Sequence, residues 1–579
     1  MNGLELNQVY RMGFWSSQLQ SIRALCKRGC VNERTAESES FRSRLQVALH
    51  PSGNIRFDVL LFISSFIAYF FASDTQLNDY DAVNYALAVR EFNVALDMPH
   101  PPGAPLFVAL VKMLNTVVGD IPLALCLMSA WGGAVFVLLW RRIFDLFLST
   151  RAAALGAVIL AISPGMWMTA SQPMSDALAA AMLSAAVLMA LYYARGARPI
   201  VFLAFTALLA ITVGIRPQFG LLAIFLLFAT MVYCRIPRRT LILSLATFTV
   251  VNLAWLMPTI YSQYNLDGSG WLTYFNQIHR FQSGFGAASG SPLLAESFNI
   301  KSIIFRAATH VGALGYFGLG LNLWYPESVG LSLQTLGTEL NPWYTDTAEW
   351  TVEGSVYTVA YIFCALICFS RVKYYAGRVQ GSESYLGYLL LFASAYFLIV
   401  VMLVPPHIRF YLPLMPFFIL LALLGAQSGL FQNKLQYALL FCAVASTLPT
   451  LRESIQISAP PVALMQQIQE QSNDTGKNTV LFLNTNASRH ALWYLPDAQI
   501  YRGEDDIAPL DLAKVFAQEK RVFSNYSTVD FDNEFDITQV ERFRRPYRVW
   551  MRHTSTALFE ITAKTKPRVL ALDTESSQP

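Results

Sequence analysis

Long apolar runs separated by short polar stretches dominate the chain between residues 57 and 450. Eleven of these runs are candidates for membrane-spanning helices, because about 20 apolar residues cross the hydrocarbon core of a bilayer. They cover residues 57–73, 122–140, 153–170, 177–194, 199–213, 219–234, 240–260, 354–370, 385–404, 411–429 and 436–450. The pattern predicts an α-helical, multi-pass membrane protein of about eleven spans.

Basic residues follow every second run, as at Arg141, Arg195, Arg238, Arg371 and Lys434. Loops rich in lysine and arginine stay in the cytoplasm. This alternation predicts a cytoplasmic N-terminus and places the chain after about residue 451 on the other side of the membrane.

Two further apolar segments do not fit this alternation as spans. Residues 104–118 contain Lys112 and are too short to cross the hydrocarbon core, so we expect a helix at the outer surface. Residues 302–323 contain Arg306 and His310 and are expected to form a re-entrant or surface helix. If they crossed the membrane, the orientation of every later segment would be reversed.

The same pattern divides the chain into three parts. Residues 1–56 form a basic cytoplasmic arm, 57–451 a membrane domain with long outer loops at 74–121 and 261–353, and 452–579 a small α/β domain outside the membrane. In the last part we expect strands at 479–483, 499–501, 521–523 and 547–551, and helices at 461–471 and 510–519.

The composition agrees with a membrane protein. Of 579 residues 54% are hydrophobic and only 14% charged, against about 25% charged residues in soluble domains. The net charge of +4 is small, which argues against nucleic acid as a partner and leaves membrane lipids. None of the seven cysteines lies in a segment expected outside, so structural disulfides are not expected.

The first outer loop carries the most prominent polar residues. Asp81 is expected at the start of a short helix, with Tyr85 one turn later on the same face. The carboxylate suits either a chemical role or a simple helix cap, and the spacing does not separate the two. His100 opens a His-Pro-Pro-Gly turn, which is either a ligand-binding element or only a turn.

Further polar residues lie at the expected outer ends of spans. Asp176 begins the fourth span, Arg216 ends the fifth, and His407, Arg409 and Tyr411 lie at the outer end of the ninth. Arginines at outer ends oppose the positive-inside trend. They either anchor helices to lipid headgroups or bind an anionic ligand such as a lipid phosphate.

These motifs, in this order, resemble the GT-C glycosyltransferases, in particular the protein O-mannosyltransferase and aminoarabinose-transferase branch. The matching segments are Asp81-Ala-Val-Asn-Tyr85, His100-Pro-Pro-Gly-Ala-Pro-Leu106, Arg216-Pro217 and Arg409-Phe-Tyr-Leu-Pro-Leu-Met-Pro416, the last with an inserted aromatic residue. The second acid that often follows the first is replaced by Ala82, which puts any role for paired carboxylates in doubt.

The resemblance implies a donor, a location and a mechanism. The donor would be a polyprenyl-phosphate sugar, the acceptor is unknown, and the transfer would be inverting at the outer face of a bacterial inner membrane. Asp81 would be the general base. The resemblance implies no cofactor and leaves a divalent metal open. The substrate-binding residues would be Tyr85, His100, Asp176, Arg216, His407, Arg409 and Tyr411.

Two other classes of function fit the same topology. A transporter or lipid flippase would also have many spans and charges within the membrane, but we find no inverted repeat. A non-catalytic protein of envelope assembly is the third reading, which the missing second acid supports. Release of polyprenyl phosphate from a polyprenyl-phosphate sugar separates the three.

Overall fold

The computed structural model describes the following residues, with a few single positions besides: 55–73, 75–234, 236–267, 274–280, 383–403, 408–426, 458–472, 478–502, 520–525, 535–544 and 555–563. The chain forms two compact units, Met1–Ser73 with Phe92–Leu451 and Asp74–Glu91 with Arg452–Pro579. We call them the helical unit and the C-terminal unit. The segment 74–91, expected in an outer loop, groups with the second.

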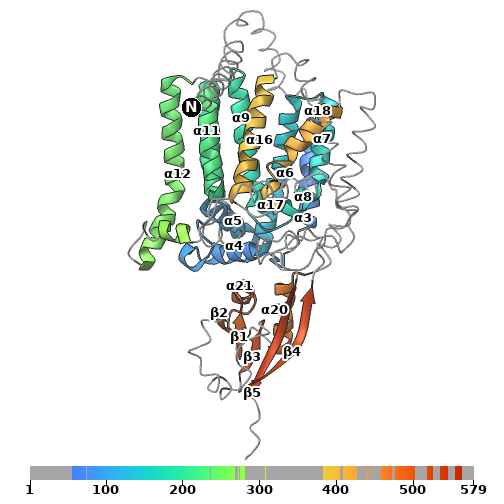
Figure 1. Ribbon diagram of the computed structural model, residues 1–579, viewed down its shortest axis with the longest axis vertical. Helices are drawn as coiled ribbons and strands as arrows, with labels where there is room; N and C mark the ends of the chain where they lie inside the picture. The colour runs from blue at the N-terminus through green and yellow to red at the C-terminus, as the bar shows by residue number, and fades with distance from the viewer. Residues whose placement is uncertain are drawn as a thin grey trace, which may run out of the picture. The chain divides into compact units, whose positions relative to one another are not determined.

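The helical unit consists of helices only in its described part. They are α3 (Ile55–Phe71), η1 (Val94–Leu96), α5 (Pro105–Val118), α6 (Ile121–Asp145), α7 (Thr150–Ile162), α8 (Pro164–Ala170), α9 (Asp176–Ala194), α10 (Pro199–Ile215), η2 (Pro217–Phe219), α11 (Gly220–Cys234), α12 (Arg238–Asp267), α16 (Glu383–Leu403), α17 (Ile408–Tyr411) and α18 (Met415–Ala426). Figure 1 shows the long helices side by side in this unit.

Five of the described helices are long and apolar enough to cross a membrane, and six if the bent pair α7 and α8 is one span. The axes of this pair differ by 57°. The protein is therefore an integral membrane protein. The expected number of eleven spans stays a prediction, since α3, α10 and α18 are shorter helices and the runs at 354–370 and 436–450 fall almost entirely outside the described residues.

The surface of these helices is apolar. Along α11, large side chains point outward every three or four residues, at Leu221, Ile224, Phe228 and Val232. A soluble protein would turn such a stripe inward. An outward stripe is compatible with lipid tails as the surrounding solvent.

Small residues let α6 approach its neighbours closely. A Cβ atom added to Gly132 would lie 2.6 Å from backbone atoms of Leu178 in α9. Further along the same two helices, the indole N–H of Trp140 donates to the hydroxyl of Ser184 over 2.9 Å. Close backbone approach and buried hydrogen bonds are the usual means of holding membrane helices together.

The short helix expected at 104–118 is present as α5. Its length of 14 residues gives about 21 Å. Gly119 ends it with a positive φ of 74°, and the carboxylate of Asp120 then accepts from the N–H of Leu123 at the start of α6. In Figure 1 it lies at the lower end of the helical unit. Its position at a membrane surface stays a prediction.

The C-terminal unit contains a five-stranded sheet of order β2-β1-β3-β5-β4. The elements are α4 (Tyr80–Arg90), α20 (Pro460–Ser472), β1 (Thr479–Leu483), α21 (Thr485–Tyr494), β2 (Gln499–Arg502), β3 (Arg521–Ser524), β4 (Phe535–Arg544) and β5 (Ser555–Ala563). β1 pairs in parallel with β2 and β3, whereas β5 runs antiparallel to β3 and β4.

Both faces of this sheet bury apolar side chains. Leu481 and Leu483 pack with α20 and α21, whereas Val480 and Phe482 face the other side with Val522. The expected strands at 479–483, 499–501 and 521–523 correspond to β1, β2 and β3, and the expected helix at 461–471 corresponds to α20. No sequence pattern predicted α21, β4 and β5, and the elements expected at 510–519 and 547–551 lie mostly or wholly outside the described residues.

Candidate functional site

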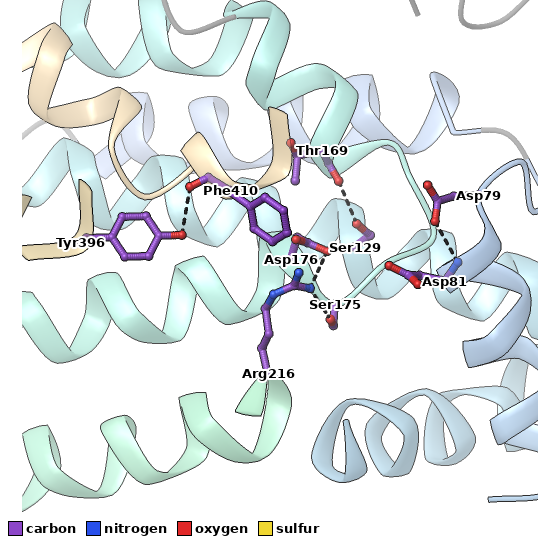
Figure 2. A network of polar contacts seen from close by, with 9 residues as sticks. All are labelled: Asp79, Asp81, Ser129, Thr169, Ser175, Asp176, Arg216, Tyr396 and Phe410. Atoms are coloured by element: carbon purple, nitrogen blue, oxygen red, sulfur yellow. Dashed lines mark hydrogen bonds and ion pairs between the residues drawn. The ribbon is translucent and has the colours of Figure 1, made fainter. Parts of the chain in front are cut away.

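A buried ion pair joins the start of α9 to the end of α10. The guanidinium Nη1 of Arg216 lies 2.8 Å from a carboxylate oxygen of Asp176 and donates to the hydroxyl of Ser175 over 3.2 Å (Figure 2). Both charged side chains are at least nine-tenths buried. The free-energy cost of removing each charge from water is several kcal/mol, and the close pairing offsets that cost.

Local structure places both residues at helix ends. Asp176 is in the first turn of α9, where the helix dipole favours a carboxylate. Arg216 is the last residue before Pro217, with an extended backbone at φ −144° and ψ 90°. A residue before proline is pushed out of the helical region, so α10 ends here. The structure therefore puts the arginine where the sequence predicted the end of a span.

A second arginine approaches from α17. The guanidinium carbon of Arg409 lies 5.2 Å from the ring centre of Phe410, and that of Arg216 lies 5.9 Å from the same ring. The hydroxyl of Tyr396 in α16 donates to the carbonyl oxygen of Phe410 over 2.9 Å (Figure 2). We call the group of Ser175, Asp176, Arg216, Arg409 and Phe410 the Phe410 cluster.

Two further residues, Tyr411 and His407, are expected near this cluster. Tyr411 comes directly after Phe410 in the sequence and is fully buried. His407 lies outside the described residues. Among the described residues, no three histidine, cysteine or acidic side chains gather closely enough to hold a metal ion.

Asp81 lies in the C-terminal unit, in the first turn of α4, and is 3% exposed. The helix cap is Asp79, whose carboxylate accepts from the N–H of Asp81 over 2.8 Å (Figure 2). The cap role that the sequence left open for Asp81 is therefore filled by another residue. Tyr85 lies one turn further on and is also buried.

Asn84 lies between these two residues and is fully buried. Its side-chain oxygen and nitrogen have no hydrogen-bond partner within the described part of the chain. A buried amide without partners lowers stability. No pattern in the sequence singles out this asparagine, although it lies only three residues from the candidate base in the same helix.

The His-Pro-Pro-Gly turn is present in the helical unit. The N–H of Gly103 donates to the carbonyl of His100 over 2.8 Å, and Gly103 has a positive φ of 84°. The hydroxyl of Tyr274 donates to the carbonyl of Pro102 over 2.8 Å. Burial raises the pKa of Tyr274 to about 12, so this hydroxyl keeps its proton at neutral pH. The turn is thus fixed from a distant part of the chain.

Three members of this site were not predicted from the sequence: Ser175, Phe410 and Tyr396. Of these three, only Phe410 could have been recognised in the sequence, because it is the extra aromatic residue in the segment from Arg409 to Pro416. This departure from the expected motif supplies the ring that both guanidinium groups approach. The contacts of Ser175 and Tyr396 span too many residues for a sequence pattern to reveal them.

No protein-family model matches the chain, and no curated protein matches it in sequence. The structure is similar to that of ArnT, an aminoarabinose transferase, from Cupriavidus metallidurans bound to undecaprenyl phosphate. The TM-score is 0.51 at 13% identity, over 87% of this chain and 97% of that chain. The oligosaccharyltransferase of Archaeoglobus fulgidus in the apo form aligns over 82% of this chain and 70% of that chain, with 13% identity and a TM-score of 0.48. The similarity to ArnT shows that this chain has a GT-C-like fold.

Proposed function

We propose that the protein is a membrane glycosyltransferase that moves a sugar from a polyprenyl-phosphate donor to an acceptor on the outer side of the membrane. The Phe410 cluster is the observation that carries this proposal. It holds two arginines at helix ends of a GT-C-like fold, and the similar ArnT structure contains undecaprenyl phosphate. Guanidinium forks suit phosphate better than ammonium groups do.

The proposed reaction is a single displacement with inversion. An acceptor hydroxyl or amine attacks the anomeric carbon, the new bond to carbon forms, and the bond from that carbon to the phosphate oxygen breaks. The electron pair leaves with the polyprenyl phosphate. Arg216 and Arg409 stabilise the charge that develops on this leaving group, an effect that is worth most in a site without water.

Asp81 is proposed as the general base that takes the acceptor proton. Its burial, its place in the first turn of α4 and the presence of a separate cap at Asp79 support this role. A positioned base contributes about 10²–10⁴-fold to a rate. With Ala82 in place of a second acid, one carboxylate would perform this step alone.

The test is a transfer assay with purified protein in lipid nanodiscs. A panel of polyprenyl-phosphate sugars is offered with hydroxyl and amine acceptors, and free polyprenyl phosphate is measured by mass spectrometry. We expect release with the wild type and about a 10²–10⁴-fold loss with Asp81→Asn. Asp79→Ser is the matched control, because it removes a neighbouring carboxylate and keeps a side chain that caps helices.

Retained turnover in Asp81→Asn would reject the base assignment. Movement of the intact donor across a vesicle membrane without cleavage would instead support the transporter reading. Failure of both release and movement, in a folded protein tested with the full panel, would favour a non-catalytic role.

A further inference from the structure

The segment that carries Asp81 contacts a part of the chain about 380–420 residues away. The side-chain oxygen of Asn78 accepts from the backbone N–H of Ala459 over 2.9 Å, across 381 residues of sequence. The hydroxyl of Ser458 donates to the side-chain oxygen of Gln76 over 2.7 Å. All four residues belong to the C-terminal unit, and Gln76 and Asn78 lie just before α4 in the sequence.

Helix α21 supplies a second set of contacts to the same segment. His490 is 1% exposed, and its Nε2 lies 3.2 Å from the carbonyl oxygen of Leu77. The hydroxyl of Tyr494 donates to the carbonyl of Gln76. The guanidinium carbon of Arg90 lies 3.6 Å from the ring centre of Trp493.

The three contacting residues of α21 follow helical spacing. His490, Trp493 and Tyr494 are related by three and four positions, so they share one face of the helix. Ala487 and Ala491 lie in the core beside α20. Neighbouring faces of α21 thus serve both purposes: Ala487 and Ala491 lie in the core, and Tyr494 packs against that core while its hydroxyl contacts the segment 74–91.

These contacts hold α4 at both ends. Gln76, Leu77 and Asn78 are fixed just before the cap Asp79, and Arg90 is fixed at the last turn. Leu77 has a positive φ of 48°, which is uncommon for a residue with a side chain. Such a conformation persists only where the surroundings determine it strongly.

We propose that the C-terminal unit positions Asp81 for reaction, with His490, Trp493 and Asn78 as positioning residues. The inference rests on the proposed role of Asp81 as a base. It assigns a task to the part of the C-terminal unit that follows residue 452, which would hold the proposed base in place. A misplacement of about 1 Å can cost about 10²-fold in rate, so a loose α4 would lower kcat.

The test combines hydrogen–deuterium exchange with transfer kinetics on the full-length protein. His490→Ala and Trp493→Ala should each speed exchange of the backbone amides of residues 80–90 by about tenfold, since they release one end of α4. In the same variants kcat should fall by about tenfold, while KM for the donor stays within about twofold. His490→Gln and Trp493→Phe should recover most of both losses, because a donor N–H and an aromatic face are kept.

Arg521→Ala is the matched control within the same unit. Arg521 pairs with Glu560 in β5 over 2.8 Å and donates to the side-chain oxygen of Gln471 in α20 over 3.2 Å. Both partners belong to the sheet and its covering helix, and neither belongs to the segment 74–91. We expect lower stability of the C-terminal unit in this variant, with unchanged exchange in α4 and unchanged kcat.

Unchanged exchange of residues 80–90 in both alanine variants would overturn the inference. So would faster exchange with unchanged kcat in a protein that Asp81→Asn inactivates. If Asp81→Asn keeps full turnover, the proposed function fails in its base assignment. Exchange would still show separately whether the C-terminal unit holds α4.

Discussion

Two groups of arginine and aspartate side chains lie among the described residues of the helical unit, and their settings differ. In the first, which we call the Asp58 cluster, Arg142 lies 2.6 Å and Arg141 4.0 Å from the carboxylate of Asp58, and Arg141 also pairs with Asp145. All four residues lie within the regular helices α3 and α6. The Phe410 cluster instead draws on the start of α9, the end of α10 and the single turn of α17.

The difference indicates that the Asp58 cluster stabilises helix packing, whereas the Phe410 cluster is the candidate binding site. Opposite charges on two adjoining helices neutralise one another and favour close packing of the helices. Charges at helix breaks lie beside backbone groups that have no partner within a helix. In a membrane protein, broken helices are tolerated where protein buries them or where they line a cavity. We therefore expect a loss of stability alone from changes in the Asp58 cluster, and a loss of transfer from changes in the Phe410 cluster.

Replacement of Arg216 tests the second half of this expectation most strongly. Arg216→Met leaves Asp176 buried without its cation, which should lower the free energy of unfolding by about 3–5 kcal/mol. Release of polyprenyl phosphate should fall by about 10²–10³-fold, because a group that stabilises the leaving charge is lost. Thermal unfolding and the transfer assay measure the two effects.

A double variant separates these two effects. Arg216→Met with Asp176→Leu removes both charges, so stability should return close to that of the wild type. Transfer should stay lost. A stable double variant with normal turnover would mean that the ion pair only holds α9 to α10.

Replacement of Asp58 tests the expectation that changes in the Asp58 cluster lower stability alone. Asp58→Ala should lower the free energy of unfolding by about 1–3 kcal/mol, since it removes a buried partner of two arginines. The loss is smaller than in the previous case because Arg141 keeps Asp145 and Arg142 is 27% exposed. Turnover per folded molecule should not change. A selective fall in kcat at full stability would show that this cluster takes part in the reaction.

Arg409→Lys keeps the charge and removes the planar fork. We expect the donor KM to rise and kcat to fall by about tenfold together, since an ammonium group binds phosphate as a point charge only. Arg409→Ala should be more severe. Equal kinetics for all three proteins would indicate that Arg409 contacts lipid headgroups and not the donor.

Phe410→Leu removes the ring and keeps an apolar side chain. The interaction of a cation with an aromatic face is worth about 0.5–1 kcal/mol at exposed sites, so a loss of at least about twofold to fivefold in kcat/KM is expected. Phe410→Trp should retain activity, because indole is the best partner for a cation. An unchanged rate in the leucine variant would leave the ring with a packing role only.

The helical part of the fold was predictable because apolar runs and their ends are local signals. The pattern placed Asp176 at the start of a helix and Arg216-Pro217 at the end of one, and both positions are observed. It could not show that the two residues form an ion pair across 40 positions, because the contact depends on how α9 and α10 pack. The position of Arg409 near the same ring has the same cause.

The missed elements of the C-terminal unit have local explanations. In β4 the alternation of apolar and polar residues is interrupted between Gln539 and Glu541, where a bulge shifts the register with β5. Phe535 packs on one face of the sheet and Phe543 on the other, although both positions are odd-numbered. A strand of constant period two cannot be recognised across such a bulge. α21 was missed because Ser488, Arg489 and His490 are polar and nevertheless buried, so its buried positions do not form an apolar pattern.

The make-up of the C-terminal unit has a consequence for biosynthesis. The partners of residues 74–91 are translated much later than this segment, since Asn78 precedes Ala459 by 381 residues. At 5–20 residues per second, roughly 20–80 s pass between the synthesis of Asn78 and that of Ala459. Until then the turn at Leu77 lacks the hydrogen bonds that determine its backbone. A chain truncated before residue 458 would carry every residue of the Phe410 cluster and still leave Asp81 unplaced. Synthesis of residues 458–494 thus acts as a checkpoint, because the proposed base is fixed only after its partners in this segment have been made.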